Sequence, residues 1–341
     1  MLTKKKQLVS VRTIIFLFLW AIAVFSYDIA DYENYKLIYS VYLPKSFMTA
    51  FYAMPDIGFI LLCKIASILG LSFSLFRGIY LTCALWLLFK GINYWSEKGI
   101  FVYCLYAFYP FLLDIVQFRY FLAYSIVLYA TRFLKTNEIK KYIIFIILAA
   151  TQHFLVLVYL MFLLFNLKID KLKITVITVT LCEIIAFLFA MPNIVNLLGN
   201  FIPRLSLYSS ANVSIEGITF FIEYLVMGIV ILIFALAVHK TDLDQEVFDF
   251  LVKLSVIAIC FIPFILIDDD YVRLYRGVLP LIYVMLYTKL KDRRYTVLTN
   301  IFIIAVVGLL FYIHLSPHSV ANYQAVTKPI FENNYFIELF R

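Results

Sequence analysis

Residues 296–315, with the sequence TVLTNIFIIAVVGLLFYIHL, decide the fold, because they contain no Asp, Glu, Lys or Arg. An α-helix of about 20 residues rises roughly 30 Å, which matches the hydrocarbon thickness of a bilayer. Similar apolar runs recur along the chain. They are continuous, whereas the strands of a membrane β-barrel alternate between apolar and polar residues. Since only helices and closed barrels satisfy their backbone in lipid, the sequence predicts an all-α polytopic integral membrane protein.

The composition excludes a water-soluble protein. Hydrophobic residues make up 64% of the 341 and charged residues only 15%, which leaves too little polar surface to cover a soluble globule. Disordered, collagen-like and cytosolic classes are excluded on the same ground. Hydropathy gives clear spans at about 11–27, 73–90, 100–115, 119–134, 174–190, 218–238, 250–267, 277–289 and 296–315.

Two further apolar regions, 57–70 and 141–167, are ambiguous by hydropathy, and the positive-inside rule is used to decide them. The basic residues Lys4 to Arg12 place the N-terminus in the cytoplasm. The other basic clusters, which we also place inside, lie at 132–141, 168–173 and 289–294.

Keeping all these clusters inside requires residues 141–167 to enter the membrane and return near His153. The forms considered are a re-entrant pair and two tilted helices. A single crossing also fits the length, but it would put the last basic cluster outside. By the same parity, Ile57–Leu69 does not cross and forms a helix on the outer surface.

About eleven crossings result, with an external C-terminus. We expect one transmembrane domain, 1–341, with an outer loop at 28–72 that contains the surface helix and an external tail at 316–341. The protein is therefore expected in a plasma membrane as a multi-pass protein. The cysteines stand singly, and we interpret them as packing residues rather than metal ligands or disulfide partners.

Arginines on the predicted outer side violate the charge rule and are functional candidates, since ionisable groups near the membrane are costly. A guanidinium also recognises phosphate through two parallel hydrogen bonds. The alternative is that each Arg pairs with a nearby carboxylate, such as Asp114 with Arg119 or Asp268–Asp270 with the arginines that follow. The outer arginines are Arg77, Arg119, Arg204, Arg273, Arg276 and Arg341.

Acidic and aromatic residues gather where the first loop leaves the membrane. The stretch 27–35 reads YDIADYENY, and the loop returns to the membrane at Asp56. A carboxylate there suits a general base, and tyrosines suit a sugar ring, although a solvated acidic loop has the same pattern. His153, at the predicted turn, is either a polar residue with satisfied hydrogen bonds and no functional role, or a proton carrier or phosphate ligand. No nucleotide-binding fingerprint occurs, so ATP is not indicated.

Short stretches at the start of the first loop and around Asp56, Arg119, His153 and Arg276 together resemble the EpsG family of bacterial exopolysaccharide proteins, within the Wzy-like polysaccharide polymerases. Tyr120 stands where that family usually has Gln. A looser similarity is to GT-C glycosyltransferases, whose first outer loop has an acidic residue, a juxtamembrane helix, a Gly and an Arg, as in Asp31, Ile57–Leu69, Gly70 and Arg77. The EpsG-like stretches are Asp31–Lys36, Asp56–Phe59, Phe118–Ala123, Ala149–Leu155, and Arg276 before a span with Tyr283.

The resemblance implies a glycosyltransferase that polymerises undecaprenyl-pyrophosphate-linked oligosaccharide units at the outer face of a bacterial membrane. It implies membrane lipid as surroundings, no cofactor, no metal and no nucleic acid, with a chain-length-regulating co-polymerase as a plausible partner. The alternatives are an O-antigen-ligase-type transferase, a flippase for the lipid-linked unit, and a scaffold subunit. The implied catalytic carboxylates are Asp31 and Glu33, with Asp28 behind them. The implied substrate-binding residues are Arg77, Arg119, His153, Arg273, Arg276, Tyr32, Tyr35 and Asp56.

Overall fold

The computed structural model describes residues 2–42, 56–96, 99–189, 215–237, 245–289 and 296–341. Within these ranges the regular structure is helical, apart from one isolated antiparallel bridge between Ser26 and Asn334. The all-α prediction is confirmed. Arg204 lies outside the described residues.

Several helices are long and apolar enough to cross a membrane, which makes this a multi-pass membrane protein. Shorter apolar helices occur at Val11–Phe25, Ile57–Ile68 and Phe154–Asn166. The count of eleven crossings stays a prediction. The five long apolar helices are Phe73–Trp95, Ile169–Phe189, Gly217–Ala235, Glu246–Leu266 and Thr296–Leu315.

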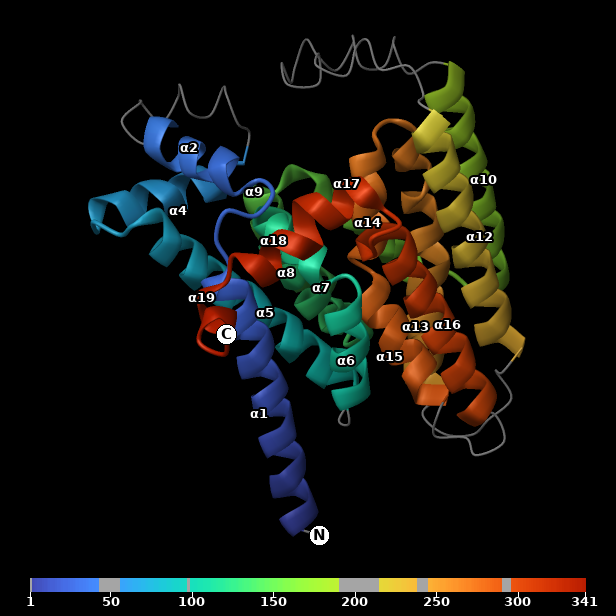
Figure 1. Ribbon diagram of the computed structural model, residues 1–341. Helices are drawn as coiled ribbons and strands as arrows, with labels where there is room; N and C mark the ends of the chain where they lie inside the picture. The colour runs from blue at the N-terminus through green and yellow to red at the C-terminus, as the bar shows by residue number, and fades with distance from the viewer. Residues whose placement is uncertain (1, 43–55, 97–98, 190–214, 238–244, 290–295) are drawn as a thin grey trace. The chain divides into compact units, whose positions relative to one another are not determined.

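The chain forms two compact units, and the first contains residues 1–51, 55–157 and 297–341. Its centre is α8, which packs against both α5 and α9, while α1 packs against α5 (Figure 1). Gly91 allows the approach of α5 to α8, because a Cβ there would lie 2.1 Å from Leu128 Cδ2. The helices of this unit are α1 (Leu2–Phe25), α2 (Tyr32–Tyr42), α4 (Ile57–Ile68), α5 (Phe73–Trp95), α6 (Ile100–Phe108), α7 (Phe111–Val116), α8 (Phe118–Lys135), α9 (Ile139–Gln152), α16 (Thr296–Leu315), α17 (Val320–Asn322), the π-helix η6 (Tyr323–Thr327), α18 (Lys328–Glu332) and α19 (Tyr335–Glu338).

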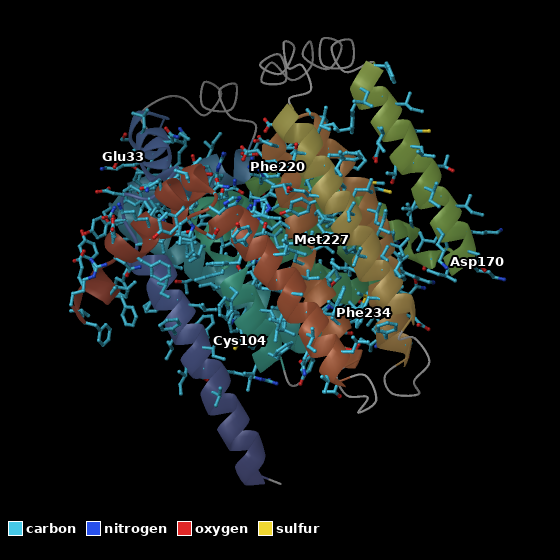
Figure 2. The ribbon with its side chains drawn as sticks, turned by 45° about the vertical axis from the view of Figure 1, so that its right-hand side comes forward. Glu33, Cys104, Asp170, Phe220, Met227 and Phe234 are labelled. Carbon is cyan, nitrogen blue, oxygen red and sulfur yellow. The ribbon has the colours of Figure 1, made fainter. Side chains whose placement is uncertain are left out.

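The second unit contains residues 52–54 and 158–296. Pro263 cannot donate a backbone hydrogen bond, and the long apolar helix gives way near it to short 3₁₀ turns. Phe220, Met227 and Phe234 recur every seven residues in the sequence of α12, and Figure 2 shows them following one another along this helix. The helices are η1 (Phe154–Asn166, shared with the first unit), α10 (Ile169–Phe189), α12 (Ile215–Ala237), α13 (Gln245–Ile257), η3 (Ala258–Phe261), η4 (Pro263–Leu266), η5 (Asp269–Tyr271), α14 (Val272–Arg276) and α15 (Leu279–Lys289).

Both ambiguous regions are helical, and the way charge parity places them in the membrane stays a prediction. Helix α4 covers Ile57–Ile68 and is followed by Gly70 in the left-handed region, with φ of +70°. Its exposed face is apolar, with Leu61, Ile65 and Ile68 uncovered, which suits contact with lipid. The region 141–167 is divided at His153, which is extended and separates α9 from η1.

Two segments contain more structure than expected. The segment predicted as the outer loop includes α2, whose Tyr32, Tyr35 and Tyr39 are buried on one face. Spacings of three and four residues place these side chains together on a helix. The predicted span 100–115 is two helices, α6 and α7, separated at Tyr109–Pro110.

Candidate functional site

The clearest polar feature of the first unit is an ion pair between Arg119 and Asp56. Arg119 Nη1 lies 2.6 Å from Asp56 Oδ2, and the two side chains are 9% and 6% exposed. Asp56 immediately precedes α4, and Arg119 lies in the first turn of α8. A positive charge there opposes the helix dipole, so the carboxylate offsets both the dipole and the cost of burial. Arg119 thus pairs with a carboxylate that is distant in sequence, whereas sequence proximity had suggested Asp114.

Asp114 belongs to a different cluster. It is 1% exposed, and its Oδ2 accepts hydrogen bonds from Tyr106 Oη at 2.9 Å and Tyr124 Oη at 2.5 Å. The two phenol oxygens lie 3.2 Å apart. These contacts join α6, α7 and α8, and they provide donors for this buried carboxylate.

Aromatic rings surround the Arg119 guanidinium. Its Cζ lies 5.0 Å from the centroid of Tyr35 and 5.2 Å from that of Phe59, which places it within cation–π range of both rings. Tyr35 and Phe59 also pack edge-on against Phe118, at 4.4 and 6.0 Å between centroids. The guanidinium is therefore fixed by one carboxylate and by rings from α2 and α4.

The break at His153 is attached to the same carboxylate. Asp56 Oδ1 accepts a hydrogen bond from the backbone N–H of Phe154 at 3.1 Å, so Asp56 holds Arg119 with one oxygen and the break with the other. The imidazole of His153 packs edge-on against Tyr120, with 5.3 Å between centroids. The structure thus brings together Asp56, Arg119 and the backbone beside His153.

Close packing of α4 against the end of α9 supports this arrangement. A Cβ on Gly58 would lie 2.3 Å from both Thr151 Oγ1 and Gln152 Nε2, so a larger residue would force these side chains to shift. Gln152 in turn accepts a hydrogen bond from Tyr80 Oη at 2.9 Å. Helix α4 therefore packs at Gly58 directly against the side chains of the two residues before His153.

Arg77 occupies a second buried position. It is 2% exposed and donates to the backbone oxygen of Ser26 at 2.8 Å and to the Ser26 hydroxyl at 3.0 Å. Its Cζ lies 5.6 Å from the centroid of Tyr32, whose hydroxyl is 3.0 Å from Ser74 Oγ. Arg77 thus ties α5 to the end of α1 and contacts the first turn of α2.

The predicted catalytic carboxylates lie on the outside of this region. Asp28, Asp31 and Glu33 are exposed, and Figure 2 shows Glu33 on the outer side of α2. Glu33 pairs with Lys36 at 2.9 Å, and Asp31 Oδ1 is 3.5 Å from Asn34 Nδ2. By contrast, Tyr32 and Tyr35 are buried, with their rings against protein side chains.

The remaining two predicted arginines lie on α14 in the second unit. Arg273 Nη2 is 2.7 Å from Asp270 Oδ2, and Arg273 Nε donates to the Asp270 carbonyl at 2.7 Å, so that expected pairing is confirmed. Arg276 is 2% exposed. In the described part of the chain, no group of three or more His, Cys, Asp or Glu side chains is placed to hold a metal ion.

A model of the EpsG family matches residues 9–326, nearly the whole chain and every residue of the arrangement described above. The chain belongs to the EpsG family. Comparisons with curated proteins and with solved structures found no significant match. Membership of the EpsG family indicates a membrane protein of polysaccharide biosynthesis.

Proposed function

We propose that this EpsG-family protein is a polymerase that joins undecaprenyl-pyrophosphate-linked oligosaccharide units at the outer face of a bacterial plasma membrane. The observation that supports this most is the buried Arg119–Asp56 pair beside the His153 break. It holds a phosphate-recognising group rigidly at the point where the first loop returns to the helices. Such fixed charges stabilise a leaving group without reorganising during the reaction.

In the proposed reaction, a hydroxyl at the non-reducing end of one unit attacks the anomeric carbon of another lipid-linked glycan. A new glycosidic C–O bond forms while the bond from the anomeric carbon to the pyrophosphate oxygen breaks, and the lipid pyrophosphate leaves with the electron pair. A carboxylate takes the hydroxyl proton. We assign this role to Asp31, with Glu33 and Asp28 as alternatives, because exposed carboxylates are accessible to a bulky acceptor.

Stabilisation of the leaving pyrophosphate is assigned to the arginines Arg77, Arg119, Arg273 and Arg276, with His153 as a further phosphate contact. For Tyr32 and Tyr35 we replace the expectation that their rings stack on sugars with a positioning role. Because their rings contact Arg77 and Arg119, we propose that they position these guanidinium groups. Asp56 has the same positioning role through its charge.

The proposed membrane topology has a cytoplasmic N-terminus, about eleven crossings and an external C-terminus. Contacts within the first unit support it. Tyr27 N donates to Asn333 O at 2.9 Å, so the first loop and the tail are adjacent, as their shared outer side requires. An even number of crossings must then separate the end of α1 from the end of α16.

The test uses full-length purified protein in nanodiscs, supplied with the host's lipid-linked repeat unit and no nucleotide sugar. A gel ladder from the wild type is expected, with severe loss in Asp31→Asn and Arg119→Lys. Matched controls are Asp170→Asn, an exposed carboxylate in the first turn of α10, and Arg132→Lys, in the last turn of α8. Both controls should retain the ladder.

Each alternative outcome is informative. A ladder from Asp31→Asn would remove Asp31 as the base and keep the polymerase. An unchanged chain length in Arg119→Lys would remove Arg119 from pyrophosphate binding. No ladder from folded wild type with authentic substrate would refute the polymerase and favour a ligase or a flippase.

A further inference from the structure

The C-terminal segment, residues 323–338, is hydrogen-bonded to the junction between α1 and the first loop. Two backbone bonds connect them, from Tyr27 N to Asn333 O at 2.9 Å and from Ala30 N to Ala325 O at 3.1 Å. The bridge between Ser26 and Asn334 adds an antiparallel contact. In Figure 1 this segment (red) runs from η6, which contacts α7, to α19 at the end of α1.

Side chains of the segment add to these backbone bonds. Asn334 is fully buried, and its Nδ2 donates to Ile22 O at 2.9 Å, one of the last carbonyls of α1, which have no partner within the helix. Asn333 Nδ2 donates to Asp28 O at 3.3 Å. Tyr27 Oη donates to Glu338 Oε1 at 2.6 Å, and its ring stacks on Tyr335 at 4.3 Å.

The part of the loop that these bonds hold has an unusual backbone. Asp28 and Asp31 have φ of +45° and +60°, in the left-handed region that residues with a side chain rarely adopt. The bonded groups, namely the N–H groups of Tyr27 and Ala30 and the carbonyl of Asp28, flank or include these positions. Such conformations persist when surrounding contacts fix them.

Helix α2 begins directly after this loop, so the loop determines where α2 lies. Its first turn brings Tyr32 to Arg77, and the next residue on that face, Tyr35, to Arg119. Asp31 precedes the helix and accepts the hydrogen bond of Tyr35 N at 3.0 Å through its backbone oxygen. A shift of the loop would therefore move Asp31 and both arginine contacts together.

We propose that residues 323–338 act as a positioning element for the reaction, holding the first loop so that Asp31 and α2 have their working geometry. Asn333 and Asn334 are its positioning residues. The inference rests on the proposed function for its catalytic part, whereas the physical restraint on the loop is independent of any activity. The expected signature is a fall in kcat, because the loop places both the proposed base Asp31 and the two tyrosines that position Arg77 and Arg119.

The experiment uses full-length Asn334→Ala and Asn333→Ala in nanodiscs, with Asn333→Gln as the conservative variant that keeps the donor. Gln324→Ala, an exposed amide of the same segment, is the matched control. Hydrogen exchange of the peptide covering residues 26–35 measures the restraint, and the lipid-linked-unit assay gives kcat and KM. Asn334→Ala should reduce kcat about tenfold and Asn333→Ala about threefold, both with faster exchange in this peptide, on the scale of one lost buried or half-buried hydrogen bond.

Recovery of both exchange protection and kcat in Asn333→Gln would support the proposal, as would wild-type values in Gln324→Ala. If Asn334→Ala fails to fold, the comparison of Asn333→Ala with Asn333→Gln tests the proposal instead. Unchanged exchange in both Ala variants would overturn the restraint, and faster exchange with unchanged kcat would overturn the positioning role. If the wild type makes no polymer, the proposed function fails, and the exchange measurement still decides whether the restraint exists.

Discussion

Replacing Asp56 with Asn removes the charge that faces Arg119 while keeping the size and one acceptor oxygen of the side chain. That oxygen can still accept the hydrogen bond of Phe154 N, which Asp56 Oδ1 receives at 3.1 Å. The variant therefore tests the ion pair separately from the attachment of the His153 break. Asp56→Leu, which removes both interactions, is the comparison.

The magnitude follows from burial. The two side chains are 9% and 6% exposed, so solvent screens the pair little, and removing one partner leaves an uncompensated charge. Breaking such a pair costs about 3–5 kcal/mol. At roughly 2 °C per kcal/mol, the lower end for larger domains, the melting temperature should fall by about 6–10 °C. The Asp56→Leu variant should lose about 1–3 kcal/mol more stability than Asp56→Asn, because the N–H of Phe154 also loses its acceptor.

The assay is a double-mutant cycle of Asp56→Asn, Arg119→Gln and the double variant in detergent. Thermal stability is read as the fraction that remains monodisperse by size-exclusion chromatography after heating. The double variant should recover most of the lost stability, since both charges are gone. It should remain inactive if Arg119 binds pyrophosphate, which separates a catalytic from a purely structural arginine.

Two results would refute this reasoning. Single variants that melt within about 1 °C of the wild type would show that the pair is neither buried nor coupled. A double variant that regains polymer synthesis along with stability would show that Arg119 serves the fold alone.

Three further predictions concern other contacts. Gly58→Ala should destabilise the protein by about 1–3 kcal/mol, because its Cβ would overpack against Thr151 and Gln152. The control Gly308→Ala in α16, which has nothing within 4 Å of its Cβ, should be neutral or slightly stabilising. Equal melting temperatures of the two variants would contradict the packing argument. Tyr124→Phe should cost about 1–3 kcal/mol in the same thermal assay by removing a donor to buried Asp114, and a change below about 0.5 kcal/mol would count against that cluster. Asp270→Asn should cost less than about 1 kcal/mol, because Asp270 is 60% exposed, and a loss as large as that in Asp56→Asn would contradict this.

The long apolar helices could be predicted because continuous apolar runs are a direct signal, and the short helix expected at Ile57–Leu69 is present and ends before Gly70. Helix α2 was missed because its tyrosines, Glu33 and Lys36 look like a polar loop in sequence. Its helical spacing of buried tyrosines was the available signal. The contacts of the C-terminal segment with the first loop had no sequence signal, since they join backbone groups that are far apart along the chain.

The two expected ion pairs show where sequence proximity is informative. Asp270 and Arg273 are three residues apart in consecutive helical segments, so helix geometry alone brings their side chains together. Asp114 and Arg119 are also close in sequence, but the turn at Gln117 separates α7 from α8 and directs Asp114 toward Tyr106 and Tyr124. Arg119 then takes Asp56, a partner that only tertiary packing provides.

The partners of the buried arginines suggest different electrostatic roles in the proposed reaction. The charge of Arg119 is already balanced by Asp56, so a pyrophosphate beside it would gain mainly oriented hydrogen bonds. Arg77 is as deeply buried, yet its contacts, the Ser26 carbonyl, the Ser26 hydroxyl and the Tyr32 ring, are all uncharged. Among the described residues no carboxylate pairs with it, so its positive charge is available to attract an anion. Since Ser26 begins the junction held by the C-terminal segment, that segment would position this charge as well as Asp31.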